Sequence, residues 1–314
     1  MLERVLSSTK RVVKRSSLVR IDRKKLKDFA RKLKKVRIPK FKKEYYPENP
    51  IDTIQFLFIV DSLNFSFFPD KRKKKWKVSF SSKKISGSFG LVLSLKKYLD
   101  YILNSYYLKN VSEKELEKIF NGYGKITLIK ERKRILNEVG RILIEKFDSQ
   151  VINLLKKANH SAESLIEILV KNFPCFRDIC EYKGRKVYFL KKAQLFVADL
   201  FRYFDGKTWG YFKDIDKLTA FADYRLPQLL YTFGVIKYAD RLHSLIKSKN
   251  EIKHCSIQEI EIRANTIWTV EYLKEELIKL GRKINSFEID WILWNMSKKV
   301  KLKIPHHRTR TIYY

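Results

Sequence analysis

Acidic residues set among apolar and aromatic ones are the groups in this sequence most able to do chemistry. Asp61 and Asn64 lie inside the apolar run FLFIVDSLNFSFF and are three residues apart, so a helix would place them on one face. Burying an unpaired polar group costs roughly 1–3 kcal/mol, and burying a charge costs more. The pair therefore either satisfies its hydrogen bonds within the fold or forms the polar wall of a pocket.

A second acidic cluster occupies the stretch YFKDIDKLTAFADYRLPQ, where Asp214, Asp216 and Asp223 are interleaved with aromatic residues. Aromatic faces stack on a flat base and carboxylates accept from its N–H edge, so this composition fits a base-binding pocket. A structural interpretation is also open. Asp223 precedes a predicted helix with Pro227 in its first turn, a position where Asp caps helices. Asp214 and Asp216 fit a solvated loop equally well.

A third cluster, EIEIRANTIWTVE, places Arg263, Ile267 and Glu271 one helical turn apart. Arg263 and Glu271 either pair across the helix face or each reach a ligand, and structural pairing is the commoner arrangement. We keep Glu271 among the candidate substrate contacts.

Several chemistries are excluded by motifs that the sequence lacks. It has no Walker A loop, no dinucleotide fingerprint and no nucleophile elbow. His306 and His307 are adjacent, and neighbouring residues of a helix or strand point apart, so we expect no metal site there. Cys175, Cys180 and Cys255 are odd in number and loosely spaced, so we expect no disulfide framework and a reducing, cytoplasmic setting.

The charge balance is extreme, with 68 Lys and Arg against 34 Asp and Glu, a formal net charge of +34. Such a field attracts polyanions, so nucleic acids and phosphate-bearing ligands are the first partners to consider. Lysine-rich surfaces also arise in hot-growing organisms, so the charge alone identifies no macromolecular partner. The most apolar stretch, IDTIQFLFIVDSLNFSFFP, is interrupted too soon for a membrane span, so we expect a soluble protein with no membrane partner.

The elements that must position these residues are mainly helices. Residues 26–33 have an amphipathic helical period, and residues 51–66 fit a buried helix. The clearest strand signal is a β-hairpin over 71–90, and a short strand is predicted at 186–190. Helical periods continue at 91–106, 112–120, 131–147, 150–157, 161–171, 191–204, 215–221, 225–233, 235–248, 256–280 and 286–295.

These elements predict a mainly α fold with one small β-hairpin. No composition break marks a linker, and no internal repeat is visible. We therefore expect a basic N-terminal helical segment, residues 1–43, packed on a single catalytic domain formed by residues 44–314.

The motifs that carry the three clusters, together with the tail, resemble the queuosine salvage protein family. The matching motifs are DSLNFSFFP, FLKKAQLFVADL, FKDIDKLTAFADYRLPQLL, EIRANTIWTVE and IPHHRTRTIYY, which together extend from about residue 44 to the last residue. The family is described as a queuosine 5'-phosphate N-glycosylase/hydrolase. The resemblance implies a fold similar to helical DNA glycosylases and hydrolysis of a nucleotide with a 7-deazaguanine base, with no cofactor and no metal.

The resemblance also implies roles for individual residues. Asp214, in the Phe-Lys-Asp motif, falls where the catalytic aspartate is expected, and Phe212, Asp216 and Asp223 fall on the base-binding stretch. Asp223 remains the alternative to Asp214 as the catalytic carboxylate. Tyr46 stands where a family histidine is expected, which places one ligand contact in doubt.

Further ligand contacts are expected from polar residues of the other matching motifs. The candidate substrate contacts there are Asp61, Asn64, Lys191 and Glu271. The 5'-phosphate requires cations, and the candidates are Lys191, Arg225, Arg308 and Arg310.

The chemistry of glycosidic cleavage agrees with an acidic site. The transition state resembles an oxocarbenium ion, which a nearby carboxylate stabilises, and a carboxylate also takes the proton of the attacking water. Two neighbouring buried carboxylates have pKa values that are pushed apart, which supplies one acid and one base. The expected partners are the nucleotide and its product queuine. The alternative is a nucleic-acid-binding protein, or a glycosylase acting on a base within DNA or tRNA, whose binding would depend steeply on salt.

Overall fold

The computed structural model describes residues 1–314, and most of them lie in helices joined by short loops. The first helices are α1 (Leu2–Arg15), α2 (Arg23–Leu33), α3 (Pro50–Ser62), α4 (Ser88–Lys96), α5 (Leu99–Leu103), α6 (Ser105–Asn110), α7 (Glu113–Ile119) and α8 (Ile129–Lys146). The remaining helices are α9 (Ile152–Ala158), α10 (Ala162–Asn172), α11 (Lys191–Tyr203), α12 (Arg225–Thr232), α13 (Asp240–Lys247), α14 (Ile257–Lys279) and α15 (Ser286–Ser297).

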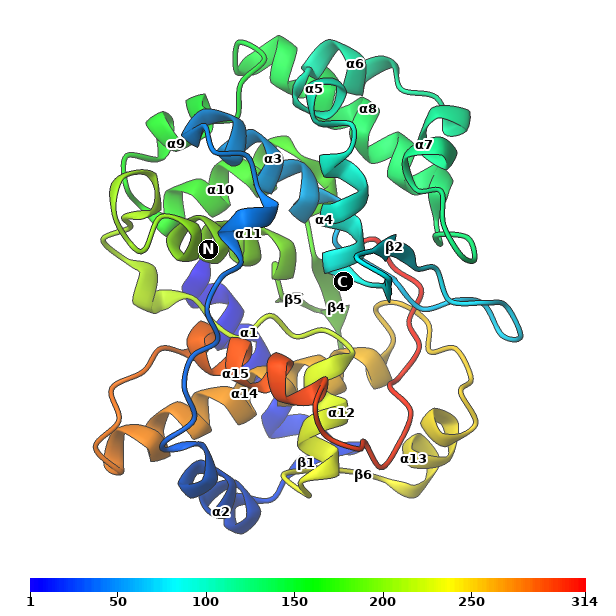
Figure 1. Cartoon of the computed structure of the whole chain (residues 1–314). Coiled ribbons are helices and arrows are strands. Elements are labelled where there is room, and N and C mark those ends of the chain that lie inside the picture. The colour runs from blue at the N-terminus through cyan, green and yellow to red at the C-terminus, as the bar shows by residue number, and fades with distance from the viewer.

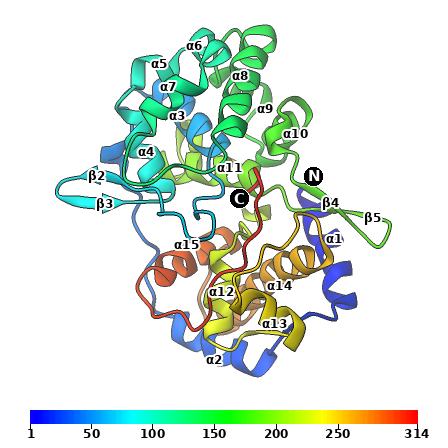
Figure 2. The ribbon, with the colours of Figure 1, turned by 90° about the vertical axis from the view of Figure 1, so that its right-hand side faces the viewer.

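Six short strands form three separate antiparallel pairs and no larger sheet. The pairs are β1 (Val19–Ile21) with β6 (Ile236–Tyr238), β2 (Val78–Phe80) with β3 (Lys83–Ile85), and β4 (Ile179–Tyr182) with β5 (Arg185–Tyr188). The β1–β6 pair ties the N-terminal segment to the middle of the chain, and the β2–β3 hairpin projects from the side of the molecule (Figure 2).

The helices form two lobes with a hydrophobic core in each. Figure 1 shows α3 to α11 in the upper half and α2 with α12 to α15 in the lower half. The larger core contains 63 buried residues and the smaller one 23. Helix α14 serves both cores, since Ile260 and Ile267 belong to the larger and Ile262 and Val270 to the smaller. A helix that is apolar on opposite faces has to be buried, and this one spans the boundary between the lobes.

The predicted fold class, mainly α with a small hairpin, is confirmed, and most of the long predicted helices are present. The buried helix predicted over 51–66 ends at Ser62, so Asp61 is helical and Asn64 lies in the loop that follows. The helix predicted over 91–106 is broken into shorter helices.

Two further predictions of secondary structure are wrong. Residues 218–223 are extended where a helix was predicted over 215–221, and only Ile215–Lys217 form a 3-10 turn. The region 235–248 contains β6 before α13, so only its second half is helical. Tertiary hydrogen bonds account for the first error, because the backbone of the extended segment is held by side chains distant in sequence.

The tail, residues 301–314, runs through the boundary between the lobes (Figure 2). Ser66 anchors it: its backbone N–H donates to the carbonyl of Tyr314 at 2.9 Å, and its hydroxyl donates to the carbonyl of Thr311 at 2.7 Å. Tyr314 is buried as a result. None of the helices combines the length and the apolar character that crossing a membrane requires.

The expectation that the cysteines form no disulfide is wrong for two of them. Cys180 and Cys255 are joined by a disulfide, and Cys175 is a free, buried thiol. The two partners are 75 residues apart in sequence, so spacing along the chain gave no sign that β4 lies beside the loop that precedes α14.

Candidate active site

A cavity of about 300 Å³ lies where α3, α11, α15 and the extended segment 218–223 meet. Four carboxyl groups line it: Asp61, Asp199, Asp223 and Asp290. In a protein with a net charge of +34, this concentration of acidic groups in one enclosed place is the feature that most needs a chemical explanation.

Asp61 contributes an unpartnered carboxyl group from the last turn of α3. Its side chain is 0% exposed, and neither of its oxygens has a hydrogen-bond partner within the chain. Burial raises the pKa of Asp61 well above its usual value, and the nearby charge of Asp199 raises it further. Burial also raises the pKa of Asp199, to about 6. A buried carboxyl group without a partner is costly, so this wall of the cavity is built to meet a ligand.

Asp223 and Asp290 also line the cavity. Oδ1 of Asp223 accepts the backbone N–H groups of Arg225 at 2.7 Å and Leu226 at 3.1 Å, which leaves Oδ2 with no hydrogen bond inside the chain. Burial raises the pKa of Asp223, and the charge of Lys191 partly offsets this. Asp290 accepts the N–H of Phe221 at 2.8 Å, and burial, then the charge of Asp223, raises its pKa well above the usual value.

Lys191 is the cation at the centre of these acids. It is buried in the first turn of α11, and its positive charge lowers the pKa of all four carboxyl groups. Asp178 Oδ2 accepts the backbone N–H of Lys191 at 3.1 Å, which fixes the residue at the start of its helix. The cavity is also lined by Lys40, Lys42, Arg202 and Lys298, so it combines several basic groups with four carboxyl groups of unequal acidity.

Aromatic side chains complete the cavity wall. The aromatic lining residues are Phe41, Tyr46, Phe89, Phe221, Trp291 and Trp294. Flat rings that line a pocket beside hydrogen-bonding carboxyl groups suit a planar heterocycle.

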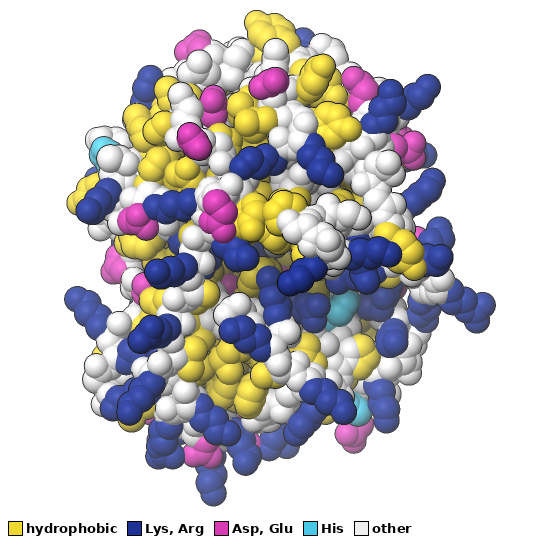
Figure 3. All heavy atoms as spheres, in the orientation of Figure 1, with side chains coloured by type: hydrophobic (Ala, Val, Ile, Leu, Met, Phe, Trp, Pro, Cys, Tyr) yellow, Lys and Arg dark blue, Asp and Glu magenta, His cyan; other side chains and the backbone are white.

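A second cavity, of about 350 Å³, adjoins the first, and Asn64, Lys191, Asp223 and Lys298 are among the residues that line both. Its remaining charged residues are all basic: Lys75, Lys84 and Arg225. In Figure 3, Lys and Arg side chains gather around the hollow at mid-height of the molecule. The first cavity is thus lined by carboxyl, basic and aromatic groups, whereas the second, the cationic cavity, has basic groups and a single carboxyl group, that of Asp223.

Two buried cations hold the end of α3 in place. Arg132 donates to the carbonyls of Leu63 at 2.6 Å and Phe65 at 2.7 Å, and Lys192 donates to the carbonyl of Ser62 at 2.7 Å. Neither cation has a carboxylate partner. The carbonyls at a helix C-terminus have no hydrogen-bond partner within the helix and carry partial negative charge. They take the place of a carboxylate as the partner of each cation, and these contacts fix the loop that contains Asn64.

The cavity brings together five of the predicted site residues: Tyr46, Asp61, Asn64, Lys191 and Asp223. Sequence reasoning missed Asp199, Arg202 and Asp290, which also line it. The signal that identified Asp61 was available for two of these, since Asp199 in AQLFVADLF and Asp290 in FEIDWILW are also acidic residues within apolar runs.

Asp214 lies outside the cavity, and its carboxylate is occupied elsewhere. It accepts from the backbone N–H groups of Ala162 at 2.6 Å and Glu163 at 3.1 Å and from the hydroxyl of Ser161 at 3.0 Å, at the start of α10. Burial opposes ionisation, but these hydrogen bonds outweigh it and lower the pKa of Asp214. The position expected for the catalytic aspartate therefore holds a helix cap.

Three other predicted contacts also lie outside the cavity. Phe212 packs in the larger core, Asp216 is exposed in the loop after Asp214, and Glu271 is a half-buried residue of α14. Arg263 does not pair with Glu271, because it forms ion pairs with Asp178 and Glu259.

Among the predicted phosphate ligands, Arg225 lines the cationic cavity, and two of the others hold the tail. Arg308 donates to the carbonyl of Pro69 at 2.5 Å, and Arg310 pairs with Asp70 at 2.7 Å and Glu251 at 3.2 Å. Both arginines are therefore committed to structural contacts.

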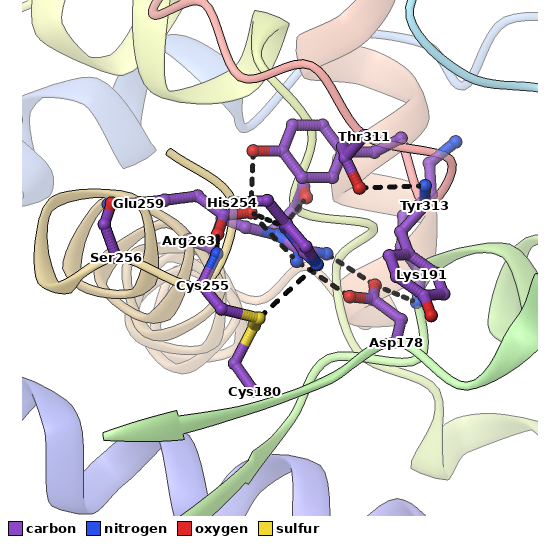
Figure 4. A network of polar contacts seen from close by, with 12 residues as sticks. Asp178, Cys180, Lys191, His254, Cys255, Ser256, Glu259, Arg263, Thr311 and Tyr313 are labelled. Atoms are coloured by element: carbon purple, nitrogen blue, oxygen red, sulfur yellow. Dashed lines mark hydrogen bonds and ion pairs between the residues drawn. A yellow bond between two sulfur atoms is a disulfide. The ribbon is translucent and has the colours of Figure 1, made fainter. Parts of the chain in front are cut away.

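A cluster of residues whose types can bind a metal lies beside Arg263 and Asp178 (Figure 4). The ligand atoms of Cys180, His254, Cys255 and Glu259 all lie within 4.8 Å of one another. The two sulfur atoms are bonded to each other, so neither is a thiolate, and thiolates are what a metal would require. We assign this cluster as a disulfide next to a hydrogen-bonded His254–Glu259 pair, with 3.2 Å between Nδ1 and Oε1.

The sequence motifs and the acidic cavity point to one family, and comparison with known proteins decides the matter. The family profile described as "Queuosine salvage protein" matches residues 43–314. The chain belongs to the queuosine salvage protein family.

Members of the queuosine salvage family from distant organisms are similar to this chain over most of its length. It is 35% identical over 317 residues to the queuosine 5'-phosphate N-glycosylase/hydrolase of Sphaerobacter thermophilus, covering 99% of this chain and 97% of that relative. The protein of the same description from Mus musculus is 38% identical over 274 residues, with 82% and 81% of the two chains covered. That of Schizosaccharomyces pombe is 32% identical over 299 residues and 86% of each chain.

Proposed function

We propose that this protein hydrolyses the N-glycosidic bond of queuosine 5'-phosphate and releases queuine. The observation that carries the proposal is the pair of adjoining cavities, one with four carboxyl groups and six aromatic residues and the other with basic residues around a single carboxyl group. A nucleotide has the matching asymmetry, with a flat base at one end and a phosphate at the other. The names of the relatives that cover most of the chain support the same reaction.

Asp223 is the carboxylate that we assign to the reacting sugar. It lines both cavities, so it lies where a base-binding and a phosphate-binding region meet. Its Oδ1 is held by two backbone N–H groups, which leaves Oδ2 available to stabilise an oxocarbenium-like sugar or to take a proton from water. The catalytic role thus moves from Asp214 to Asp223.

The base end requires help in departure, because a 7-deaza base has carbon at position 7 and cannot be protonated there. Assistance has to come from the pyrimidine edge of the ring. Burial raises the pKa values of Asp61 and Asp290 well above the usual value, so these two carboxyl groups are suited to donate a proton to that edge as negative charge develops. Tyr46 and Trp291 supply ring faces beside them.

The phosphate end is assigned to the cationic cavity. Lys75, Lys84, Arg225 and Lys298 surround it, and Arg225 offers a planar guanidinium that pairs with two phosphate oxygens at once. Lys191 lies between the two cavities and contacts the sugar or its phosphate.

The test is to incubate purified protein with queuosine 5'-phosphate and with queuosine nucleoside and to follow free queuine by chromatography. We expect release from the nucleotide, and we expect Asp223→Asn to reduce kcat by at least about 100-fold, the usual contribution of a general base or charge stabiliser. Asp214→Asn is the matched control, since it removes an equivalent carboxylate that lies outside the cavity.

Each outcome has a definite meaning. Full loss in Asp214→Asn with activity retained in Asp223→Asn would return the catalytic role to Asp214. A folded wild-type protein that releases queuine from neither compound, but from an oligonucleotide in a salt-dependent manner, would favour the glycosylase acting within a nucleic acid.

A further inference from the structure

Arg263 is a fully buried cation that lines neither of the two cavities of the active site. It lies in the middle of α14, its side chain is 0% exposed, and its guanidinium is stacked between the rings of Phe189 at 4.0 Å and Tyr314 at 4.3 Å. Burial opposes its charge, but the carboxylate of Asp178 outweighs this and raises the pKa of Arg263. The group is therefore a fixed cation with no direct access to a ligand.

One edge of the guanidinium is joined to the segment that contains Lys191. Nη1 and Nη2 donate to the two oxygens of Asp178 at 2.8 and 2.6 Å, a bidentate pair. Asp178 in turn accepts the backbone N–H of Lys191 at 3.1 Å, and its main-chain carbonyl accepts that of Phe189 at 3.0 Å. Figure 4 shows this chain of contacts from Arg263 through Asp178 to Lys191.

The other edge is joined to the segment that contains Asp223. Nε of Arg263 donates to the carbonyl of Ala222 at 3.1 Å, one residue before that carboxylate. Residues 218–223 have no helix or strand of their own to hold them, so such side-chain contacts determine where Asp223 lies. A single planar group thus restrains both sides of the active site.

We propose that Arg263 is a positioning residue that sets the separation between the Lys191 ammonium and the Asp223 carboxylate. This inference rests on the proposed function, in which both groups meet the substrate. Glu259 lies 3.5 Å from Nη1 and accepts from the hydroxyl of Tyr314 at 2.8 Å, so the guanidinium is itself held in one orientation. The rigid fork suits this task because a lysine at the same place is a point charge on a flexible chain.

Arg263→Lys is the decisive variant, since it keeps the buried charge but cannot hold Asp178 and Ala222 together. We expect kcat for queuine release to fall about 10- to 100-fold, because a displacement of about 1 Å at a reacting group costs on the order of 100-fold. We expect KM, and the Kd for queuine measured by titration, to change by less than about 3-fold, since the cavity walls are untouched.

Two further variants make the test independent of stability. Asp178→Asn keeps the shape of the side chain but removes the negative charge that pairs with Arg263, so we expect the same loss of kcat. The double variant should have a kcat little lower than that of either single variant. Glu261→Gln is the matched control. Glu261 lies on α14 and is 1% exposed, and its carboxylate accepts hydrogen bonds from Ser17, Leu18 and Tyr182. We therefore expect the variant to lower the melting temperature and to leave kcat unchanged.

The proposal is overturned if kcat per folded molecule is unchanged in both Arg263→Lys and Asp178→Asn. It is also overturned if Glu261→Gln loses kcat as they do, because the effect then follows stability. Should Arg263→Lys fail to fold, Asp178→Asn decides alone by the split between kcat and KM. A folded wild-type protein that releases no queuine would instead refute the proposed function.

Discussion

At the scale of single residues, the site depends on carboxyl groups that are harder to ionise than usual. Burial raises the pKa of Asp61 and of Asp199, and the charge of Asp199 raises that of Asp61 further. Such a pair is unfavourable for folding at neutral pH, because ionising either carboxyl group costs more free energy in the folded protein than in the unfolded chain. Unfavourable groups concentrated in one cavity are typical of a functional site.

Asp199→Asn should therefore stabilise the protein near neutral pH. The pKa of Asp199 is about 6 in the fold against 3.8 in the unfolded chain, so the folded state binds more protons between these values and wild-type stability falls as pH rises from about 4 to about 6. The variant should gain about 1–2 kcal/mol at pH 7 after allowance for solvent screening, and nothing at pH 4. Urea unfolding across this range measures the gain. Asp216→Asn, an exposed control, should show none, and a gain independent of pH would contradict the assignment.

At the scale of elements, Asp214 explains how α10 begins. Its carboxylate receives two backbone N–H groups and the hydroxyl of Ser161, which itself caps the helix by accepting from Ser164. A helix N-terminus carries partial positive charge, so an ionised carboxylate there is stabilised. The loop 211–217 and α10 are consequently tied together.

Asp214→Asn should weaken that tie and leave the chemistry intact. We expect a loss of about 0.5–2 kcal/mol in the free energy of unfolding, the usual range for a lost helix cap, with kcat within about 2-fold of wild type. Because the fold lowers the pKa of Asp214, its contribution is present at neutral pH and is lost as pH falls below about 4. Urea unfolding at pH 7 and pH 3 tests this. An inactive variant with wild-type stability would be evidence against a purely structural Asp214.

Periodicity along the chain was enough to predict α11, α12, α14 and α15, because each has apolar residues in a regular helical pattern. The same approach failed for residues 218–223, where the conformation is imposed by Gln194, Arg263 and Asp290 from distant elements. Within the acidic cluster Asp223 lines the cavity and Asp214 does not, so the order that we propose for the two is the reverse of the order expected from the sequence. Contacts between distant segments decide whether an aspartate faces a helix terminus or a cavity. The residues next to it in the sequence do not reveal those contacts.

At the scale of the whole molecule, the disulfide closes a large loop. Cys180 and Cys255 are 75 positions apart in sequence, and the residues between them include α11, α12 and the extended segment with Asp223. Cross-linking such a loop restricts the unfolded chain, and the expected stabilisation is about 2–4 kcal/mol. Sequence spacing alone could not reveal the pairing, because the residues between the two cysteines form helices of their own before the chain comes back to lie beside β4 at the start of α14.

Reduction should therefore lower the melting temperature. We expect one free thiol per denatured, unreduced chain by a colorimetric thiol assay, three after reduction, and a loss of about 2–4 kcal/mol in the free energy of unfolding. Cys180→Ser should lose the same amount without a reductant. Cys175→Ser, which removes the free thiol, is the control for the response to reductant. Three free thiols in the unreduced protein would contradict the disulfide.

The exposed lysines beside the two cavities have a consequence for how a substrate arrives. Lys84 and Lys298 are exposed at the cationic cavity, and Lys298 also lines the first cavity, whereas Asp61 is buried. A nucleotide phosphate drawn in by the overall positive field would meet these lysines before the base reaches the carboxyl groups. Dissolved salt screens exposed charges within about 8 Å at physiological ionic strength and affects an enclosed site far less. Ionic strength would then govern capture, while the bond cleavage that follows proceeds in a space the salt barely reaches.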